Sequence, residues 1–397
     1  MVWYSPYAYE VHEDPYPFYR ALRQEAPLYR NEELGFWALS RHADVLAALR
    51  DTASFSNARG VSLDRSSHEH AEAVMSFLAM DPPRHTRMRA LVSRGFTPRR
   101  VAGLEPRIRE LAAGYTGRLR DTGGGCVIED FAGRLPMDVI SEMLGVPEAD
   151  RDGLRRLADT IVHREEGVHD VPPRGVQASL EAMQYLFELV KEREARPRDD
   201  LTSALLAAEL DGERLRKRDV VAFLHLMIIA GNETTTKLLG NALYWLWRHP
   251  DQRTRVAEDP TEAVPRWVEE TLRYDSSTQA LARTVTRPVA LHDRTLPEGD
   301  KLLLLLGSAN RDERVFPDPD SYDLDRSTTA MLSFGQGTHF CMGAALARLE
   351  GRVALEEWWR RLADWEIEPD GIERVHSANV RGFARLPFVT RAGGRGS

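Results

Sequence analysis

One cysteine in this chain has neighbours that few folds can accommodate. The stretch FGQGTHFCMG, residues 334–343, holds Cys341 and three glycines, and an apolar helical pattern follows it from 344 to 350. Glycine lets a backbone approach a flat ligand closely and adopt positive φ. A cysteine just before a helix start lies near free N–H groups, which lower a thiol pKa. We therefore expect this loop to present a thiolate to a ligand. The alternative, a buried structural cysteine, is the usual role of a lone cysteine.

A second constraint comes from a long helical pattern at residues 220–247. It is apolar nearly all round, which is typical of a helix buried in a large core, and Asp219 is placed to cap its start. Within it lies AGNETTT, residues 230–236, which is rich in poor helix formers. Residues that disfavour a helix but lie inside a buried one often mark a functional site. A simple helix kink is the alternative.

Composition excludes several classes of protein. The net charge of −8 gives no basic field for nucleic acid or anionic membrane. Two cysteines are too few for a disulfide framework or a four-thiolate zinc site, and they suit a reducing cytosol. No apolar run reaches the ~18 residues of a membrane helix. We expect a cytoplasmic protein with no membrane segment.

The two motifs together resemble those of the cytochrome P450 family. Residues 334–343 match the family's haem-binding loop, Phe-Gly-x-Gly-x-His-x-Cys-x-Gly, at every defining position. Residues 230–234 match its oxygen-binding segment, Ala-Gly-x-Glu/Asp-Thr. The resemblance covers essentially the whole chain. It implies a mostly α fold with small antiparallel β-sheets and one haem b between two helices. The glycines at 123–125 are the best candidate for a domain boundary, but haem-facing motifs lie on both sides, so we expect one domain over 1–397.

The resemblance also implies which residues hold the haem. Cys341 is the thiolate ligand of the iron, and thiolate ligation favours O–O cleavage. His85 and Arg89 share one face of a helix that follows two prolines and match the family's propionate-binding positions, as Arg283 does on a strand. The full set of haem contacts that we expect is His85, Arg89, Ala230, Arg283, Phe334, Gly335, His339, Cys341 and Gly343.

Two residues of the central helix are the expected catalytic pair. By resemblance, Thr234 hydrogen-bonds dioxygen at the haem and Glu233 relays protons through water. Glu270 and Arg273, three residues apart on a later helix, match a buried family pair that anchors the cysteine loop. We assign that pair a structural role.

The expected substrate site combines helix periodicity with the resemblance. Residues three and four positions apart, counted back along the chain from Thr234, share one face of the helix. The expected contacts are Phe223, Met227, Ala230, Thr278, Gln279, Ala280, Leu281 and Phe383. This set predicts a mostly apolar organic substrate, hydroxylated at an unactivated carbon. Arg65, His68 and Arg381 would reach an acidic end if their loops fold inward.

Electrons must come from a separate partner, since no flavin or iron–sulfur segment is present. We expect a ferredoxin and its reductase, docking on a basic face of an otherwise monomeric protein. The candidates for that face are Arg94, Arg99, Arg100, Arg348 and Arg352. Two alternatives stay open. A peroxygenase of the same fold would use peroxide directly, although such relatives typically lack the acid–threonine pair. A haem-binding sensor or carrier would need the cysteine loop but not Glu233 and Thr234.

Overall fold

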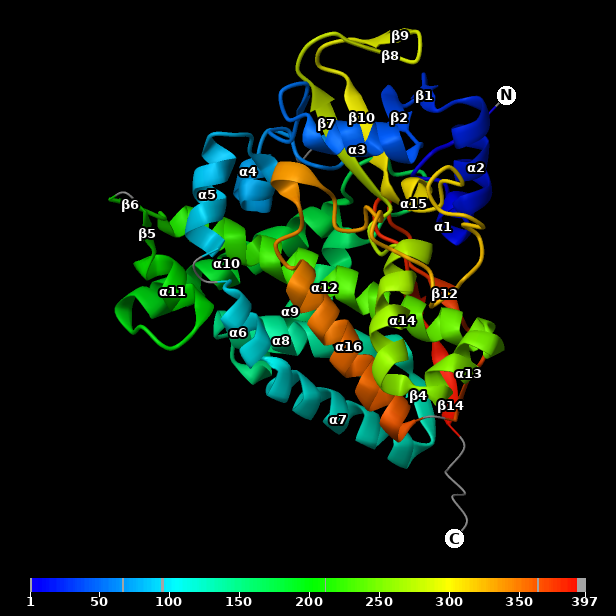
Figure 1. Ribbon diagram of the computed structural model, residues 1–397. Helices are drawn as coiled ribbons and strands as arrows, with labels where there is room; N and C mark the ends of the chain where they lie inside the picture. The colour runs from blue at the N-terminus through cyan, green and yellow to red at the C-terminus, as the bar shows by residue number, and fades with distance from the viewer. Residues whose placement is uncertain (1, 66–67, 94–95, 211, 363, 391–397) are drawn as a thin grey trace.

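Helices make up most of the molecule, and a smaller β region lies at one side of them. The structure is a computed structural model and describes residues 2–65, 68–93, 96–210, 212–362 and 364–390. In Figure 1 the strands β1, β2, β7 and β10 lie together above the helices, and α12 passes through the middle of the helical part. The main apolar core surrounds α12, and two smaller clusters pack against the sheet.

The central helix α12, Lys217–Arg248, forms as its apolar pattern predicts. Helices α8 (Leu135–Leu144), α9 (Glu148–Val162), α10 (Pro173–Ala195) and α16 (Ala344–Arg361) pack around it. It begins before Asp219, not after it. Asp219 lies in the first turn, where its carboxylate accepts the backbone N–H of Arg216 at 3.1 Å, so it caps the helix from within.

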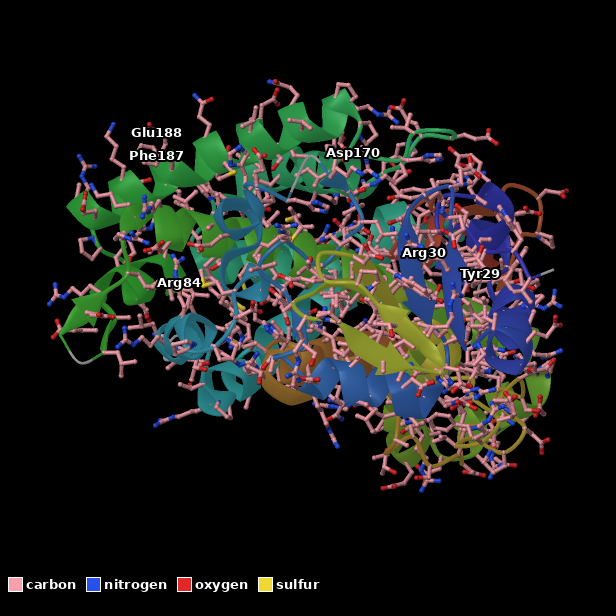
Figure 2. The ribbon with its side chains drawn as sticks, turned by 90° about the horizontal axis from the view of Figure 1, so that it is seen from above. Tyr29, Arg30, Arg84, Asp170, Phe187 and Glu188 are labelled. Carbon is pink, nitrogen blue, oxygen red and sulfur yellow. The ribbon has the colours of Figure 1, made fainter. Side chains whose placement is uncertain are left out.

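The outer helix α10 is separated from α9 by a short connection. Helix α9 ends at Val162 and α10 begins at Pro173. Figure 2 shows α10 along one edge of the molecule, with Phe187 and Glu188 on its outer side. Asp170 lies in the connection that precedes α10.

The main sheet has the strand order β1-β2-β10-β7-β3. Its strands are β1 Leu28–Asn31, β2 Phe36–Leu39, β10 Lys301–Leu305, β7 Ala280–Val285 and β3 Phe55–Ser56. All neighbouring pairs are antiparallel except β2 and β10, which are parallel. The second sheet, β11-β14-β4, joins Trp365–Ile367, Pro387–Thr390 and Gly124–Cys126.

The other elements connect these parts. The remaining helices are α1 Tyr9–Glu13, α2 Tyr16–Glu25, α3 His42–Arg50, α4 Ala71–Met75, α5 Arg84–Ser93, α6 Pro98–Gly103, α7 Glu105–Thr122, α11 Leu201–Ala207, α13 Pro250–Glu258, α14 Pro260–Tyr274 and α15 Leu306–Ala309. Short helical turns are η2 Ser76–Ala79, η3 Ile128–Ala132 and η4 Gly337–His339. Three hairpins pair β5 Glu209–Leu210 with β6 Glu213–Arg214, β8 Val289–Leu291 with β9 Arg294–Leu296, and β12 Glu373–Arg374 with β13 Phe383–Arg385. Within the described ranges, every helix is too short or too polar to cross a membrane.

A buried ion pair joins α14 to the segment that leads into the cysteine loop. Arg273 Nη2 lies 2.6 Å from Glu270 Oε1, and both side chains are 0% exposed. The same guanidinium donates to the backbone oxygens of Asn310, Pro319 and Ser321. The pair therefore holds three points of the 310–321 segment against α14.

Removing the arginine of this pair should destabilise the protein strongly. In Arg273→Ala, Glu270 remains buried, loses its nearest cationic partner and keeps Arg326 Nε at 3.5 Å; breaking a buried pair in this way typically costs ~3–5 kcal/mol. Arg266→Ala is the matched control because Arg266 pairs with Asp325 on an exposed surface, where an ion pair contributes at most ~1 kcal/mol. Denaturant unfolding of both variants measures the difference. Equal losses of unfolding free energy would contradict this role of the buried pair.

Candidate functional site

A cavity between α12 and the cysteine loop brings together residues that are far apart in the sequence. From α12 it is bordered by Phe223, Met227, Ala230, Gly231 and Thr234. From the loop and the start of α16 it is bordered by Phe334, Gly335, His339, Cys341 and Gly343. Helix α5 contributes Arg89, and the segment around β7 contributes Thr278, Leu281 and Arg283. The two motifs therefore face each other across one space.

The cysteine loop needs glycine at two positions. Gly335 and Gly337 have φ of +68° and +71°, which disfavour other residues. A Cβ at Gly337 would also lie 3.2 Å from the backbone oxygen of Leu49. The N–H of Cys341 donates to the oxygen of Phe334 at 2.9 Å, which closes the loop and turns the sulfur toward the cavity.

The electrostatics of Cys341 correct one expectation. Burial raises the pKa of the Cys341 thiol, and the N–H groups of Gly343 and Ala344 with the charges of Arg89 and Arg348 only oppose that rise. The helix start at α16 therefore does not by itself keep the Cys341 thiol deprotonated. A coordinating metal ion deprotonates a thiol outright, so this loop favours a thiolate once iron is bound. Within the described ranges, no group of three or more His, Cys, Asp or Glu side chains forms an alternative metal site.

Positive and hydrogen-bonding groups gather near the loop side of the cavity. Arg283 is buried, and the one hydrogen bond that its guanidinium makes among the described residues goes to the oxygen of Ala282 at 2.8 Å. Burial lowers the pKa of Arg283 to about 10. Arg89 donates to the oxygens of Thr338 and Phe340 at 3.4 and 2.7 Å. The Arg283 charge has no acidic partner at ion-pair distance within the described ranges.

Two histidines extend this group. The rings of His85 and His339 have their centroids 4.1 Å apart, and no ring nitrogen of either has a hydrogen-bond partner among the described residues. Burial lowers their pKa values to about 4 and about 3, so both are neutral donors near pH 7. His339 borders the cavity, and His85 lies behind it. Unsatisfied buried donors beside an unpaired arginine fit the two carboxylates of a haem.

The face of α12 opposite Cys341 has small side chains and the hydroxyl groups of Thr234 and Thr235. Ala230 and Gly231 leave space above the cavity, and Thr234 Oγ1 donates to the oxygen of Ala230 at 2.8 Å. Glu233 does not border the cavity. Successive helix residues are ~100° apart, and the Glu233 carboxylate turns toward Lys237 Nζ, 3.2 Å away.

Five of the eight expected substrate contacts border the cavity, namely Phe223, Met227, Ala230, Thr278 and Leu281. The other three need correction. Ala280 packs on the opposite face of β7 from Leu281, against the cluster around Tyr4 and Tyr19, because alternate strand residues face opposite sides. Gln279 turns away and donates to the oxygen of Ser276 at 2.7 Å. Phe383 is fully buried against Tyr244.

The expected charged contacts for an acidic substrate also lie elsewhere. Arg381 is buried and pairs with Asp275 at 2.7 Å, while Arg65 and His68 are not among the residues that border this cavity. The cavity is consequently apolar on its α12 side.

Sequence analysis missed several polar residues at the cavity wall, namely Thr235, Ser277, Ser333 and Glu350. Glu350 of α16 is buried there, and burial raises its pKa to about 8. Ser277 also borders the cavity, and its hydroxyl has no partner among the described residues. Glu350 had a signal in the sequence, since it follows the cysteine loop within an apolar helical pattern. Ser277 had none.

Comparisons with known proteins agree with this fold and site. The family model described as Cytochrome P450 matches residues 174–374. The protein named cytochrome P450 123 in Mycobacterium tuberculosis is 58% identical over 390 residues, which are 98% of this chain and 97% of that protein. The structure of a cytochrome P450 from Chondromyces apiculatus is 39% identical, with a TM-score of 0.87 and 98% of each chain covered. That of a Bacillus megaterium relative, in complex with testosterone, is 31% identical, with a TM-score of 0.84 and 95% and 99% coverage.

A glycine-rich cysteine loop, a cavity beside a buried helix and these relatives together define a haem monooxygenase. The chain belongs to the cytochrome P450 family. It is accordingly an oxidoreductase that takes a small-molecule substrate and dioxygen, and its cofactor is haem.

Replacing the loop cysteine should abolish thiolate ligation. In Cys341→Ser the ligand is a much weaker donor, so the reduced carbon monoxide complex should lose the red-shifted Soret band of thiolate haem. Cys126→Ser is the control because Cys126 lies on β4, away from the cavity, and it should keep the band. Retention of the red-shifted band in Cys341→Ser would overturn the ligand assignment.

Proposed function

We propose that this chain is an O₂-dependent monooxygenase with one haem b in a single domain. Its substrate is a mostly apolar molecule, which it hydroxylates. Its electrons come from a separate ferredoxin and its reductase. One observation carries the proposal. The Thr234 hydroxyl faces an apolar cavity across from the Cys341 sulfur, with the acid Glu233 next to it in the chain.

Haem b is the form of haem that suits these residues. The two cysteines lie far apart, and the chain has no Cys-x-x-Cys-His sequence for covalent attachment. Cys341 would ligate the iron, and Arg89, Arg283, His85 and His339 would hold the carboxylates. When bound, haem supplies the iron at which dioxygen is reduced and activated.

The protein's own residues bind the substrate, exclude water and deliver protons. Phe77, Phe96, Phe223, Leu226, Met227 and Leu281 give the cavity apolar walls. Thr234 Oγ1 can donate toward the cavity once it leaves the Ala230 oxygen, and Glu233 can then return a proton to it through water. This acid–alcohol pair is the feature that a sensor or carrier would not need.

The cavity wall favours a neutral, mostly apolar substrate. Its α12 side carries no charged side chain among the described residues, and Ser277 and Thr278 supply neutral hydroxyl groups. Apolar burial contributes about 25 cal/mol per Å², so it would dominate the affinity, while the hydroxyls would orient the molecule. The testosterone bound by the Bacillus megaterium relative belongs to this chemical class.

A basic docking surface is supported by fewer residues than expected. Arg348 pairs with Glu269 at 2.6 Å and Arg352 with Glu105 at 2.6 Å, so both charges are partly compensated. Arg99 and Arg100 are exposed on α6, and Arg94 lies outside the described residues. We propose that Arg99 and Arg100 contribute to docking of an acidic ferredoxin.

Loss of the Thr234 hydroxyl tests the proposed oxygen activation. Thr234→Ala should keep haem and substrate binding but lower product formed per electron, since general acid catalysis typically contributes a factor of about 10²–10⁴. Thr234→Ser keeps a hydroxyl and is the matched control. NADH consumption, peroxide release and oxygenated product are measured together. Wild-type coupling in Thr234→Ala would remove the residue from the mechanism.

Enlarging a cavity residue tests the substrate site. Leu281→Phe should weaken binding of neutral apolar compounds about 5- to 100-fold, because overpacking typically costs ~1–3 kcal/mol. Optical spin-shift titration with a panel that includes testosterone gives the affinities. Thr295→Phe, on the exposed β8–β9 hairpin, is the control and should bind as wild type does. Unchanged affinity in Leu281→Phe would show that the substrate lies elsewhere.

A further inference from the structure

A second hollow, which we call the outer groove, lies among α4, α5, α10 and the first turns of α12. Its volume is about 550 Å³, within the ~300–1,000 Å³ that is usual for small-molecule sites. Figure 2 shows Phe187 of α10 and Arg84 of α5 at this end of the molecule. The apolar lining of the groove comes from Ala73, Met80, Met88, Met183, Phe187 and Val221. Among the described residues, none borders both this groove and the haem cavity.

A buried histidine joins three of the four walls of the outer groove. His225 of α12 is 0% exposed, with Nδ1 3.0 Å from the oxygen of Val74 on α4 and Nε2 3.0 Å from Ser179 Oγ on α10. A carbonyl oxygen only accepts, so Nδ1 carries the proton and Nε2 accepts from the Ser179 hydroxyl. These two bonds fix α4 and α10 against α12. The groove is therefore a fixed feature of the fold.

The most buried polar side chain of the outer groove has no partner. Ser76 is 1% exposed, and its Oγ has no hydrogen-bond partner among the described residues. Buried hydroxyl groups are nearly always hydrogen-bonded, so an unpaired one at the wall of a hollow indicates a ligand. The φ of Ser76 is +49°, a conformation in which serine is strained and glycine is not. Ser76 is therefore the polar contact that we expect a ligand in the groove to use.

The lining of the outer groove suits a neutral ligand. Two of its acidic side chains have cationic partners, since Glu72 pairs with Arg84 and Asp219 pairs with Arg216 at 2.7 Å. The other acidic side chain, Glu69, is exposed at the rim, where water screens its charge. The three methionines are flexible and polarizable, so they adapt to apolar molecules of different shapes. A neutral, mostly apolar molecule with one acceptor group fits these residues.

One wall separates the outer groove from the haem cavity. On η2, Ser76 borders the groove and Phe77 borders the cavity. On α12, Ala222 borders the groove and Phe223 borders the cavity, and the ring centroids of Phe77 and Phe223 are 6.0 Å apart. The Phe77 ring also lies 5.7 Å from the ring of His85, which would hold a haem carboxylate. A molecule bonded to Ser76 thus contacts the residue next to Phe77.

We propose that the outer groove is a second binding site for a neutral, mostly apolar molecule that accepts a hydrogen bond from Ser76. Its occupant alters the affinity of the haem cavity through Phe77. This site goes beyond the proposed function, because filling it requires neither turnover nor a substrate in the haem cavity. The link is reciprocal, so a ligand in either site changes the affinity of the other by the same factor.

Counting bound molecules tests the second site. The probes are testosterone and the neutral dye Nile red, which each carry a carbonyl group that can accept from Ser76. In equilibrium dialysis of the ferric holoprotein, wild type should bind one molecule more than Ala73→Trp, whose indole fills the groove from an exposed position of α4. Ala257→Trp, at an exposed position of α13, is the matched control and should bind as wild type does. Equal numbers in wild type and Ala73→Trp for both probes would overturn the site.

The role of the hydroxyl is tested by Ser76→Gly, which removes the side chain and also the backbone strain. The affinity of the groove should fall about 2- to 10-fold, the loss expected for one hydrogen bond, while the midpoint of unfolding should not fall. Dialysis in a Leu281→Phe background, where the haem cavity binds weakly, measures the groove alone. Wild-type groove affinity in Ser76→Gly, or lost stability without lost affinity, would refute Ser76 as the ligand contact.

Spin-state titration tests the link between the two sites. The testosterone curve of wild type should depart from a single-site hyperbola, whereas that of Ala73→Trp should follow one. A hyperbola in wild type would refute the action through Phe77. Leu281→Phe separates this proposal from the proposed substrate site, since it should weaken the spin shift and still bind the molecule in the groove. An unchanged spin shift with groove binding intact would refute the substrate site and leave the outer groove standing.

Discussion

In the proposed haem site, the sulfur of Cys341 carries a negative charge inside a cavity that disfavours charge, and the arrangement of the site answers that conflict. Burial raises the pKa of the thiol, and two backbone N–H groups and two arginines offset only part of the effect. A bound iron ion would supply the remainder, because a coordinating metal deprotonates a thiol. The loop that carries this sulfur turns at Gly335 and Gly337, which have positive φ, and the Glu270–Arg273 ion pair holds the segment that precedes it against α14.

The central helix meets opposite demands on its two sides. Toward the cavity it presents Ala230, Gly231 and Thr234, which leave room for small molecules and supply one hydroxyl. Away from the cavity it holds Glu233 and Lys237 as a buried ion pair beside α9. The poor helix formers at 230–236 therefore lie where the helix needs small side chains toward the cavity and charged side chains on its other side.

Much of this was predictable from the sequence, and the failures have physical causes. The loop was found from three glycines around one cysteine, the central helix from its apolar pattern, and the 230–236 segment because its residues contradict helix propensity. Ala280 was placed in the cavity because a strand pattern does not say which of its two faces meets which layer, and the packing of Tyr4 and Tyr19 decides that. The thiol pKa was misjudged because helix-end effects act locally, whereas burial depends on the whole fold.

The central claim is that one thiolate from this chain ligates haem iron between α12 and α16. X-ray absorption at the iron edge of the purified ferric protein tests it most directly, because the technique resolves the atoms bound to iron. The account predicts a single sulfur neighbour together with the four porphyrin nitrogens. A first shell containing only nitrogen and oxygen would contradict it.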